Sequence, residues 1–323
     1  MMKTILLTNH YPAAPYDIVK SELPEGFRLV MLSENTQECL EAAAPEADYI
    51  LASGRVKLNQ AVLDKAQKVK MIQRTGVGLD SLDLAALKAR GIPLYVNAGV
   101  NAESVAEHAL LLILACLRRL PEIHRNTAAG IWKKQEQGVK TRELAGRTVG
   151  LVGMGSIARA LVRLLSGFGV TVLYYDPFRL SEERERALNV MYVPLDQLLH
   201  EAEIVSLHCP LTDGTRHLLN RETFAQMRDG AILVNTARGG LIDNAALVEA
   251  LESGKLSFAG LDVHSEEPID KENPILPLSN VILTPHIGGV TYDSFRSMMH
   301  DAMRNIKLFD EGKLDEIAPY LKQ

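Results

Sequence analysis

The chain has few cysteines and no long hydrophobic run. Its cysteines, Cys39, Cys116 and Cys209, are far apart among 323 residues and lack zinc-ligand spacing. So few thiols fit a reducing cytoplasm rather than a disulfide-stabilised secreted protein. The longest apolar stretch, residues 109–117, is far shorter than the roughly 20 residues that span a bilayer. The apolar N-terminal run is too short for a signal peptide. We therefore expect a cytoplasmic protein with no metal site and no membrane partner.

Basic residues are not in surplus, which argues against a nucleic-acid-binding surface. Lysine and arginine number 35 against 40 acidic residues, giving a net charge of −5. The short basic pairs at 118–119 and 133–134 are interpreted as solvated surface. A hydrophobic content of 47% is ordinary for a globular protein, and 323 residues exceed the usual size of one core. We expect two domains and a small-molecule substrate.

Runs of β-forming residues alternate with helical patterns along the chain, as is typical of parallel sheets covered by helices. Five strands are predicted first, at 4–8, 28–32, 49–52, 71–74 and 93–97, with helices at 16–22, 35–43, 59–66 and 82–89. Six more strands follow, at 148–152, 170–175, 204–208, 232–235, 259–262 and 281–284. Six strands with intervening helices predict a complete doubly wound sheet.

Three further segments have distinct patterns. Residues 101–120 are apolar around nearly the whole helix, so we predict a buried helix that ends at Pro121. Residues 126–144 contain Trp132 and mixed charge without strong periodicity. They are interpreted as an irregular arm that either caps the site or reaches a partner subunit. Residues 292–308 are predicted to form a helix that returns to the first domain.

A dinucleotide fingerprint follows the strand at 148–152, in the sequence Gly153-Met-Gly155-Ser-Ile-Ala158. Glycines let the backbone turn tightly and approach a pyrophosphate, whose charge faces the amino end of the following helix. Ala158 is an accepted substitute for the third glycine, since that position mainly sets the distance between helix and strand. The strand, turn and helix together therefore predict a Rossmann nucleotide site.

The next strand ends in Asp176, which indicates the coenzyme. A carboxylate there can accept hydrogen bonds from the adenine-ribose hydroxyls and would repel a 2′-phosphate. NAD is therefore favoured. Arg179 lies three residues further on and leaves NADP use open.

A cation, a carboxylate and an imidazole follow the fingerprint. Arg238 comes after a predicted strand, and its guanidinium suits holding the carboxylate and polarising the carbonyl of a 2-oxo acid. Histidine is the usual general acid–base, which points to His286. Glu266 or Glu267 would orient the imidazole and stabilise its charged form. Spacing alone does not choose between these two glutamates.

These motifs resemble the D-isomer-specific 2-hydroxyacid dehydrogenases over nearly the full length of the chain. Beyond the fingerprint and Asp176, the resemblance rests on ordered matches at 74–80, 101–107, 208–212, 235–240, 261–263, 267–268 and 285–289. It implies a Rossmann NAD-binding domain, residues 100–289, inserted into a flavodoxin-like substrate domain, residues 1–99 with 290–323. It also implies a substrate cleft between the domains and a homodimer in which the arm near Trp132 contacts the other subunit.

The resemblance also assigns residues. The family's catalytic arginine, glutamate and histidine fall on Arg238, Glu267 and His286, and Glu267 is chosen because the family glutamate precedes proline. Substrate contacts fall on Arg74, Gly76, Val77, Gly78, Arg238 and His286. Cofactor contacts fall on Gly153, Gly155, Ser156, Ile157, Asp176, Cys209, Thr236, Ala237, Asp262 and Gly288.

Glyoxylate, hydroxypyruvate or another small 2-oxo acid is the expected substrate. Phosphoglycerate is less favoured, because Ser53 stands where phosphoglycerate dehydrogenases of the family commonly carry an arginine, and because the chain ends before their regulatory domain would begin. Formate is disfavoured, since formate dehydrogenases have glutamine where Glu267 stands. An NAD(H)-sensing corepressor-like protein is the alternative from another class. A hydrolase or isomerase that uses Cys209 is a third reading without a motif of its own.

Overall fold

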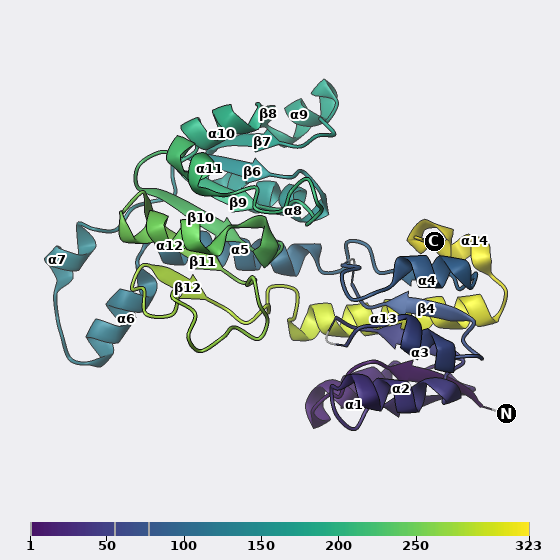
Figure 1. The fold of residues 1–323 in the computed structure, drawn as a ribbon. Coiled ribbons are helices and arrows are strands. Elements are labelled where there is room, and N and C mark those ends of the chain that lie inside the picture. Colours follow the sequence, from purple (N-terminus) through teal and green to yellow (C-terminus); the bar gives the residue numbers. More distant parts are fainter. Residues whose placement is uncertain (1, 55, 77, 323) are drawn as a thin grey trace. The chain divides into compact units, whose positions relative to one another are not determined.

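The computed structural model describes residues 2–54, 56–76 and 78–322 (Figure 1). The chain forms two compact units. Unit 1 comprises Met1–Asn101 and Thr291–Gln323, and unit 2 comprises Ala102–Val290. Each unit is built on a parallel sheet covered by helices, which confirms the predicted class of two doubly wound α/β domains.

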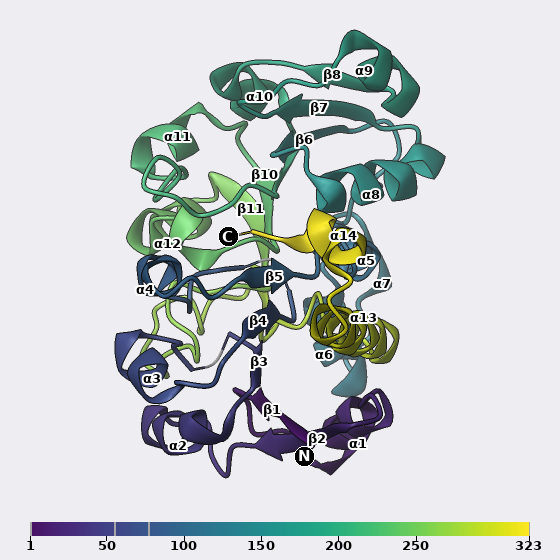
Figure 2. The same ribbon diagram turned by 90° about the vertical axis from the view of Figure 1, so that its right-hand side faces the viewer.

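The sheet of unit 1 has the flavodoxin-like strand order β2-β1-β3-β4-β5. Its strands are β1 (Lys3–Leu7), β2 (Phe27–Met31), β3 (Tyr49–Ala52), β4 (Met71–Arg74) and β5 (Leu94–Val96). One face carries α2 (Gln37–Ala43), α3 (Gln60–Lys65) and α4 (Leu84–Ala89), and the other carries α1 (Ala13–Ser21) and α13 (Tyr292–Asp310) (Figure 2). Short turns of helix complete the unit at η1 (Ala44–Glu46), α14 (Leu314–Ile317) and η4 (Ala318–Tyr320). The predicted return of the C-terminal helix to the first domain is thus confirmed.

The sheet of unit 2 has the order β12-β11-β10-β9-β6-β7-β8, the Rossmann order with one further strand at the β12 edge. Its strands are β6 (Thr148–Val152), β7 (Thr171–Tyr175), β8 (Val190–Tyr192), β9 (Ile204–Leu207), β10 (Ala231–Asn235), β11 (Leu256–Leu261) and β12 (Val281–Leu283). The prediction of six strands was wrong by one. Strand β8 has only three residues, and Met191 at its centre is 55% exposed, so it lacks the apolar run that identifies buried strands.

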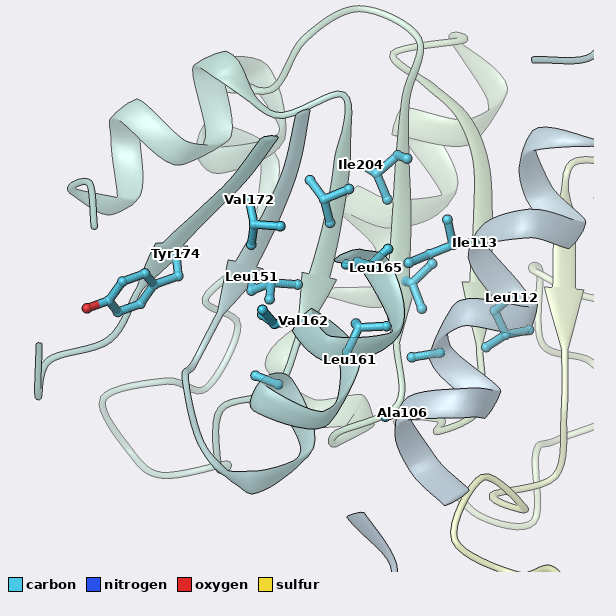
Figure 3. Close-up of a cluster of buried hydrophobic side chains, with 14 of the residues drawn as sticks. Ala106, Leu112, Ile113, Leu151, Leu161, Val162, Leu165, Val172, Tyr174 and Ile204 are labelled. Atoms are coloured by element: carbon cyan, nitrogen blue, oxygen red, sulfur yellow. The ribbon is translucent and has the colours of Figure 1, made fainter. Parts of the chain in front are cut away.

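Helices cover both faces of this sheet. The face bearing α5 (Ala102–Leu117) and α8 (Ser156–Leu165) buries an aliphatic cluster against β6, β7 and β9, including Leu112, Leu151, Leu161 and Ile204 (Figure 3). Also present are α9 (Glu182–Leu188), α10 (Leu195–Glu201), α11 (Arg221–Gln226), α12 (Asn244–Glu252), η2 (Ser166–Phe168) and η3 (Gly239–Leu241). Helices α10, α11 and α12 pack on the opposite face. The strands themselves read as near-continuous apolar runs because both faces are covered.

The arm between α5 and β6 differs from its prediction in two ways. Helix α5 ends at Leu117, and Pro121 lies in the first turn of a new helix, α6 (Leu120–Ala128), where proline is well tolerated. Residues 126–144 are not wholly irregular, since they hold the end of α6 and the short α7 (Lys134–Gly138). Helix α6 buries none of its residues, so its few apolar side chains do not pack into the core of unit 2. Figure 1 shows α6 and α7 standing away from the sheet of unit 2.

Candidate active site

The glycine turn of unit 2 joins β6 to α8 and has the form that a pyrophosphate requires. Gly153 has a φ of 100°, and a Cβ there would lie 2.7 Å from the carbonyl carbon of His208. A side chain at position 153 is therefore excluded both by the positive φ and by the lack of space for a Cβ. Gly155 is the N-cap of α8 and supplies no side-chain cap, so the first backbone N–H groups of the helix, from Ser156 and Ile157, stay available to an anion.

Asp176 follows β7 and lies over this turn. One carboxylate oxygen accepts a hydrogen bond from the N–H of Met154 at 2.8 Å, and the other accepts one from the N–H of Phe178 at 2.8 Å. The negative charge is thereby fixed beside the nucleotide turn. This is the place from which a carboxylate can contact an adenine ribose.

The remaining predicted cofactor residues lie where β9, β10 and β11 end. Cys209 follows β9, Thr236 and Ala237 follow β10, and Asp262 follows β11. The hydroxyl oxygen of Thr236 is buried and has no hydrogen-bond partner among the described residues. A buried polar atom without a partner is costly, so a ligand that bonds this hydroxyl would be favoured. The turn, the carboxylate and the orphaned hydroxyl together fit a dinucleotide.

The thiol of Cys209 does not have the character of a nucleophile. Burial raises its pKa to about 11, and the nearby Asp176 carboxylate acts in the same direction. The thiol is therefore neutral at physiological pH, whereas the thiolate is the reactive form. This removes the physical basis of the hydrolase or isomerase reading.

Arg238 is carried by a sharply folded loop after β10. The fully buried Asn235 holds the loop in place: its side-chain oxygen accepts from the N–H of Ala237, and its amide donates to the carbonyl of Arg238, both at 2.9 Å. The next residue, Gly239, lies so close to His264 that a Cβ would come within 2.0 Å of its carbonyl. The Arg238 loop therefore packs directly against the loop that carries Glu267.

Glu267 and His286 form a hydrogen-bonded pair. Nδ1 of His286 lies 2.7 Å from Oε2 of Glu267, and the N–H of His264 donates to Oε1 at 3.0 Å. Because a carboxylate only accepts, Nδ1 carries the proton and Nε2 remains for another partner. Burial raises the pKa of Glu267, but the hydrogen bonds from His286 and His264 outweigh it, so the pKa lies below the ordinary value. Glu267 is thus an ionised carboxylate that orients the imidazole.

The loop bearing His286 is anchored by the buried carboxylate of Asp262. This carboxylate accepts from the N–H groups of Ile287 and Gly288, at 2.9 and 2.8 Å, and from the hydroxyl of Thr284 at 2.5 Å. The backbone carbonyl of Asp262 accepts from the N–H of His286 at 2.7 Å. His286 itself has a φ of 55°, an uncommon conformation for a residue with a side chain. These bonds hold the backbone of His286 in that conformation and so fix the position from which its imidazole extends.

His108 of α5 completes the network around Asp262. Its Nε2 lies 2.9 Å from the hydroxyl of Thr284, which already donates to Asp262, so Nε2 is the donor. Burial raises the pKa of Asp262, but donors on His108, Thr284 and the backbone bring it far below the ordinary value. Sequence reasoning missed His108, Thr284 and Asn235 as positioning residues. The available signal was a polar residue at the start of the apolar run of α5, and polar residues at the ends of β10 and β12.

The predicted substrate residues of unit 1 lie where β4 ends. Arg74 is largely buried, and its guanidinium donates to the carbonyls of Gly78 at 2.6 Å and Ala52 at 3.1 Å. Gly76 and Gly78 belong to the loop that follows, and Val77 lies outside the described residues. Ser53, after the neighbouring β3, donates its hydroxyl to Asn9 at 2.5 Å.

The described residues offer no membrane-spanning helix and no metal-binding cluster. None of their helices is both long and apolar enough to cross a membrane. They contain no cluster of three or more His, Cys, Asp or Glu side chains that could hold a metal ion.

Comparisons with known proteins agree with the geometry of unit 2. The family model described as D-isomer specific 2-hydroxyacid dehydrogenase, NAD binding domain, matches residues 110–288. A hydroxypyruvate reductase of Thermotoga maritima is 41% identical over 78% of this chain and 81% of its own length. A glyoxylate reductase of Korarchaeum cryptofilum is 36% identical over 94% of this chain and 88% of its own length. A D-3-phosphoglycerate dehydrogenase of Methanocaldococcus jannaschii is 39% identical, but the match spans only 53% of that protein.

Solved structures show the same fold. The D-lactate dehydrogenase of Aquifex aeolicus, complexed with NAD and lactic acid, has a TM-score of 0.87 at 30% identity and covers 99% of this chain and 98% of its own. These matches give no support to the corepressor-like alternative. The chain belongs to the D-isomer specific 2-hydroxyacid dehydrogenase family of NAD-dependent oxidoreductases.

Proposed function

We propose that this protein interconverts a small 2-oxo acid and the corresponding D-2-hydroxy acid, with glyoxylate or hydroxypyruvate as the favoured substrate and 3-phosphoglycerate as the alternative. The observation that carries this proposal is the Glu267–His286 pair, 2.7 Å apart, with the loop of Glu267 packed against the loop of Arg238. Together, an oriented imidazole and a permanent cation supply the proton and the carboxylate contact that a 2-oxo acid needs. The names of two relatives, a hydroxypyruvate reductase and a glyoxylate reductase, support the substrate class.

Each of the three residues has one task in this proposal. Arg238 binds the substrate carboxylate and polarises the carbonyl oxygen through its guanidinium. Nε2 of His286 gives a proton to that oxygen during reduction and removes it during oxidation. Glu267 holds Nδ1 and stabilises the charged imidazole, in the way that a buried carboxylate orients a catalytic histidine elsewhere. NAD, when bound, accepts or supplies the hydride.

We assign the other predicted cofactor contacts to unit 2 and the other predicted substrate contacts to unit 1. In unit 2, Gly153, Gly155, Ser156, Ile157, Asp176, Cys209, Thr236, Ala237, Asp262 and Gly288 would hold NAD. In unit 1, Arg74, Gly76, Val77 and Gly78 would contact the substrate. We accordingly assign residues 100–289 to NAD binding, and residues 1–99 with 290–323 to the substrate.

The polar groups at the end of β3 and β4 favour a small uncharged substituent on the substrate. Ser53 donates to Asn9, and two donors of the Arg74 guanidinium are taken up by backbone carbonyls. A phosphate binds best where several cationic donors point at it. Arg55, on the loop after Ser53, lies outside the described residues.

We also propose a cytoplasmic homodimer. The arm carries the exposed apolar side chains Leu120, Ile131, Trp132 and Val139, of which Trp132 is 81% exposed, and Leu111 on the preceding α5 is also exposed. Clustered apolar exposure of this kind marks protein interfaces. Free thiols at Cys39, Cys116 and Cys209 support a reducing compartment.

The reaction is tested by oxidation of NADH with a panel of 2-oxo acids. We expect turnover with glyoxylate and hydroxypyruvate, weaker turnover with 3-phosphohydroxypyruvate, and lower kcat/KM when NADPH replaces NADH. The decrease in absorbance of the reduced nicotinamide measures each rate. Absence of turnover with every acid in the panel would contradict the proposal.

Arg238→Ala and His286→Ala should each abolish most turnover, with a loss of about 10²–10⁴-fold in kcat for removal of the general acid–base. NADH binding, measured by nicotinamide fluorescence, should remain nearly intact in both variants. His200→Ala, which removes an exposed histidine from α10, is the matched control and should keep full activity. Unchanged turnover in His286→Ala or Arg238→Ala would defeat the assigned role.

The lowered pKa of Glu267 predicts a pH-dependent contribution to stability. Its folded-state pKa lies below the unfolded value of about 4.3, so the contribution is present above that pH and is lost as the pH falls through the folded pKa. Glu267→Gln should therefore melt below the wild type at pH 7, and the difference should close as the pH falls from about 4.3 through the folded-state pKa of Glu267. Glu266→Gln, at the exposed neighbour, should show little difference at any pH. A constant difference for Glu267→Gln would show that the carboxylate charge is not involved.

The homodimer is tested by light scattering on the purified protein, which should give twice the mass of the chain. Leu120→Arg should shift the mass to that of one chain, because it places a charge in the proposed apolar interface. Met191→Arg alters an equally exposed apolar residue on β8 and should leave the dimer intact. A wild-type mass equal to one chain would rule the dimer out.

A further inference from the structure

The loop after β7 carries the basic residue Arg179 as well as the acidic Asp176. The side chain of Arg179 is fixed by its neighbours. Nε and Nη2 of Arg179 donate to the two carboxylate oxygens of Glu185, at 2.8 and 2.9 Å. The guanidinium carbon lies 5.1 Å from the centre of the Tyr192 ring, within cation–π range. A bidentate pair stacked on an aromatic ring has one preferred geometry, unlike an ordinary surface arginine.

Glu185 is in turn anchored to the core of unit 2. The Tyr174 ring is fully buried, and its hydroxyl points out of the aliphatic cluster (Figure 3). That hydroxyl donates to Glu185 at 2.7 Å and accepts from the N–H of Leu180 at 2.9 Å. The Glu185 side chain is only 11% exposed. The hydrogen bonds from Arg179 and Tyr174 lower the pKa of Glu185 to about 2, so this carboxylate is charged at physiological pH.

Arg179 and Asp176 face different surroundings. Arg179, Glu185 and Tyr192 line a surface hollow of about 370 Å³ together with Val190 and Met191 on β8, and Asp176 does not line it. The Asp176 carboxylate is held over the glycine turn by the N–H groups of Met154 and Phe178. The loop thus presents its carboxylate to the nucleotide turn and its guanidinium to α9 and β8.

We propose that Glu185 is a positioning residue for coenzyme choice. It holds the guanidinium of Arg179 away from the adenine ribose, so that Arg179 does not bind the 2′-phosphate of NADP. In Rossmann sites an arginine near the end of this strand accommodates the 2′-phosphate of NADP, whereas a carboxylate favours NAD. This chain has both residue types three positions apart. A 2′-phosphate would meet the repulsion of Asp176 and would also have to compete with a largely buried carboxylate for Arg179. The inference rests on NAD use and is independent of the roles proposed for Arg238, Glu267 and His286.

The test measures binding of NADPH and NADH by nicotinamide fluorescence, so no turnover is needed. Asp176→Ser removes the repulsion and provides the background. Adding Glu185→Gln keeps an acceptor for the Tyr174 hydroxyl but removes the charge that holds Arg179. We expect the Asp176→Ser/Glu185→Gln protein to bind NADPH about tenfold more tightly than Asp176→Ser alone, the scale of one charge-assisted hydrogen bond. Adding Arg179→Met should abolish this gain.

NADH affinity across the same variants separates this role from a merely structural one. General loosening of the loop would weaken NADH and NADPH alike, whereas release of Arg179 should improve NADPH alone. Glu185→Asp, which keeps the charge but shortens its reach, is a second way to release Arg179 and should give a smaller gain. The proposal is overturned if NADPH affinity does not rise in either Glu185 variant, or if the gain survives Arg179→Met.

Discussion

The carboxylate of Asp262 accepts hydrogen bonds from two backbone N–H groups and one hydroxyl of the loop that carries His286. A buried carboxylate is costly unless its oxygens are satisfied, so the loop has little choice of path. That path places His286 beside Glu267 in an uncommon backbone conformation. The side chains at the candidate active site therefore depend on a group that is itself buried.

The parallel sheet explains why this anchoring is possible. All strands of unit 2 run the same way, so the loops after β6, β7, β9, β10, β11 and β12 emerge at one edge. Close packing then connects them: Gly239 touches the backbone of His264, and Gly153 touches that of His208. A glycine at each contact lets two loops approach more closely than side chains would allow. The arrangement thus follows from topology together with a few residues of minimal size.

The same edge shows how neighbouring charges can be kept apart. Asp176 and Arg179 lie on one short loop, yet the first is bonded to backbone N–H groups at the glycine turn and the second to Glu185 on α9. Opposite charges so close in sequence would otherwise pair with each other. Each is held by a partner with better geometry, which leaves the loop with one acidic face and one basic face.

The sequence by itself determined the strand–turn–helix of the nucleotide site, ten of the twelve strands within a residue or two, and β11 to within three, because buried strands and glycine turns leave local patterns. The family was indicated separately, by the resemblance of motifs that occur in the same order along the chain. It did not reveal β8 or α6, since a three-residue edge strand and a nine-residue helix with few apolar side chains leave only short patterns. Only the tertiary structure decided that His108, Thr284 and Asn235 support the site and that Glu185 holds Arg179. The contacts of His108, Thr284 and Glu185 join residues distant along the chain or on different elements, and their geometry exists only once the strands and helices have packed. The bonds of Asn235 are local, but they depend on the fold of the loop after β10.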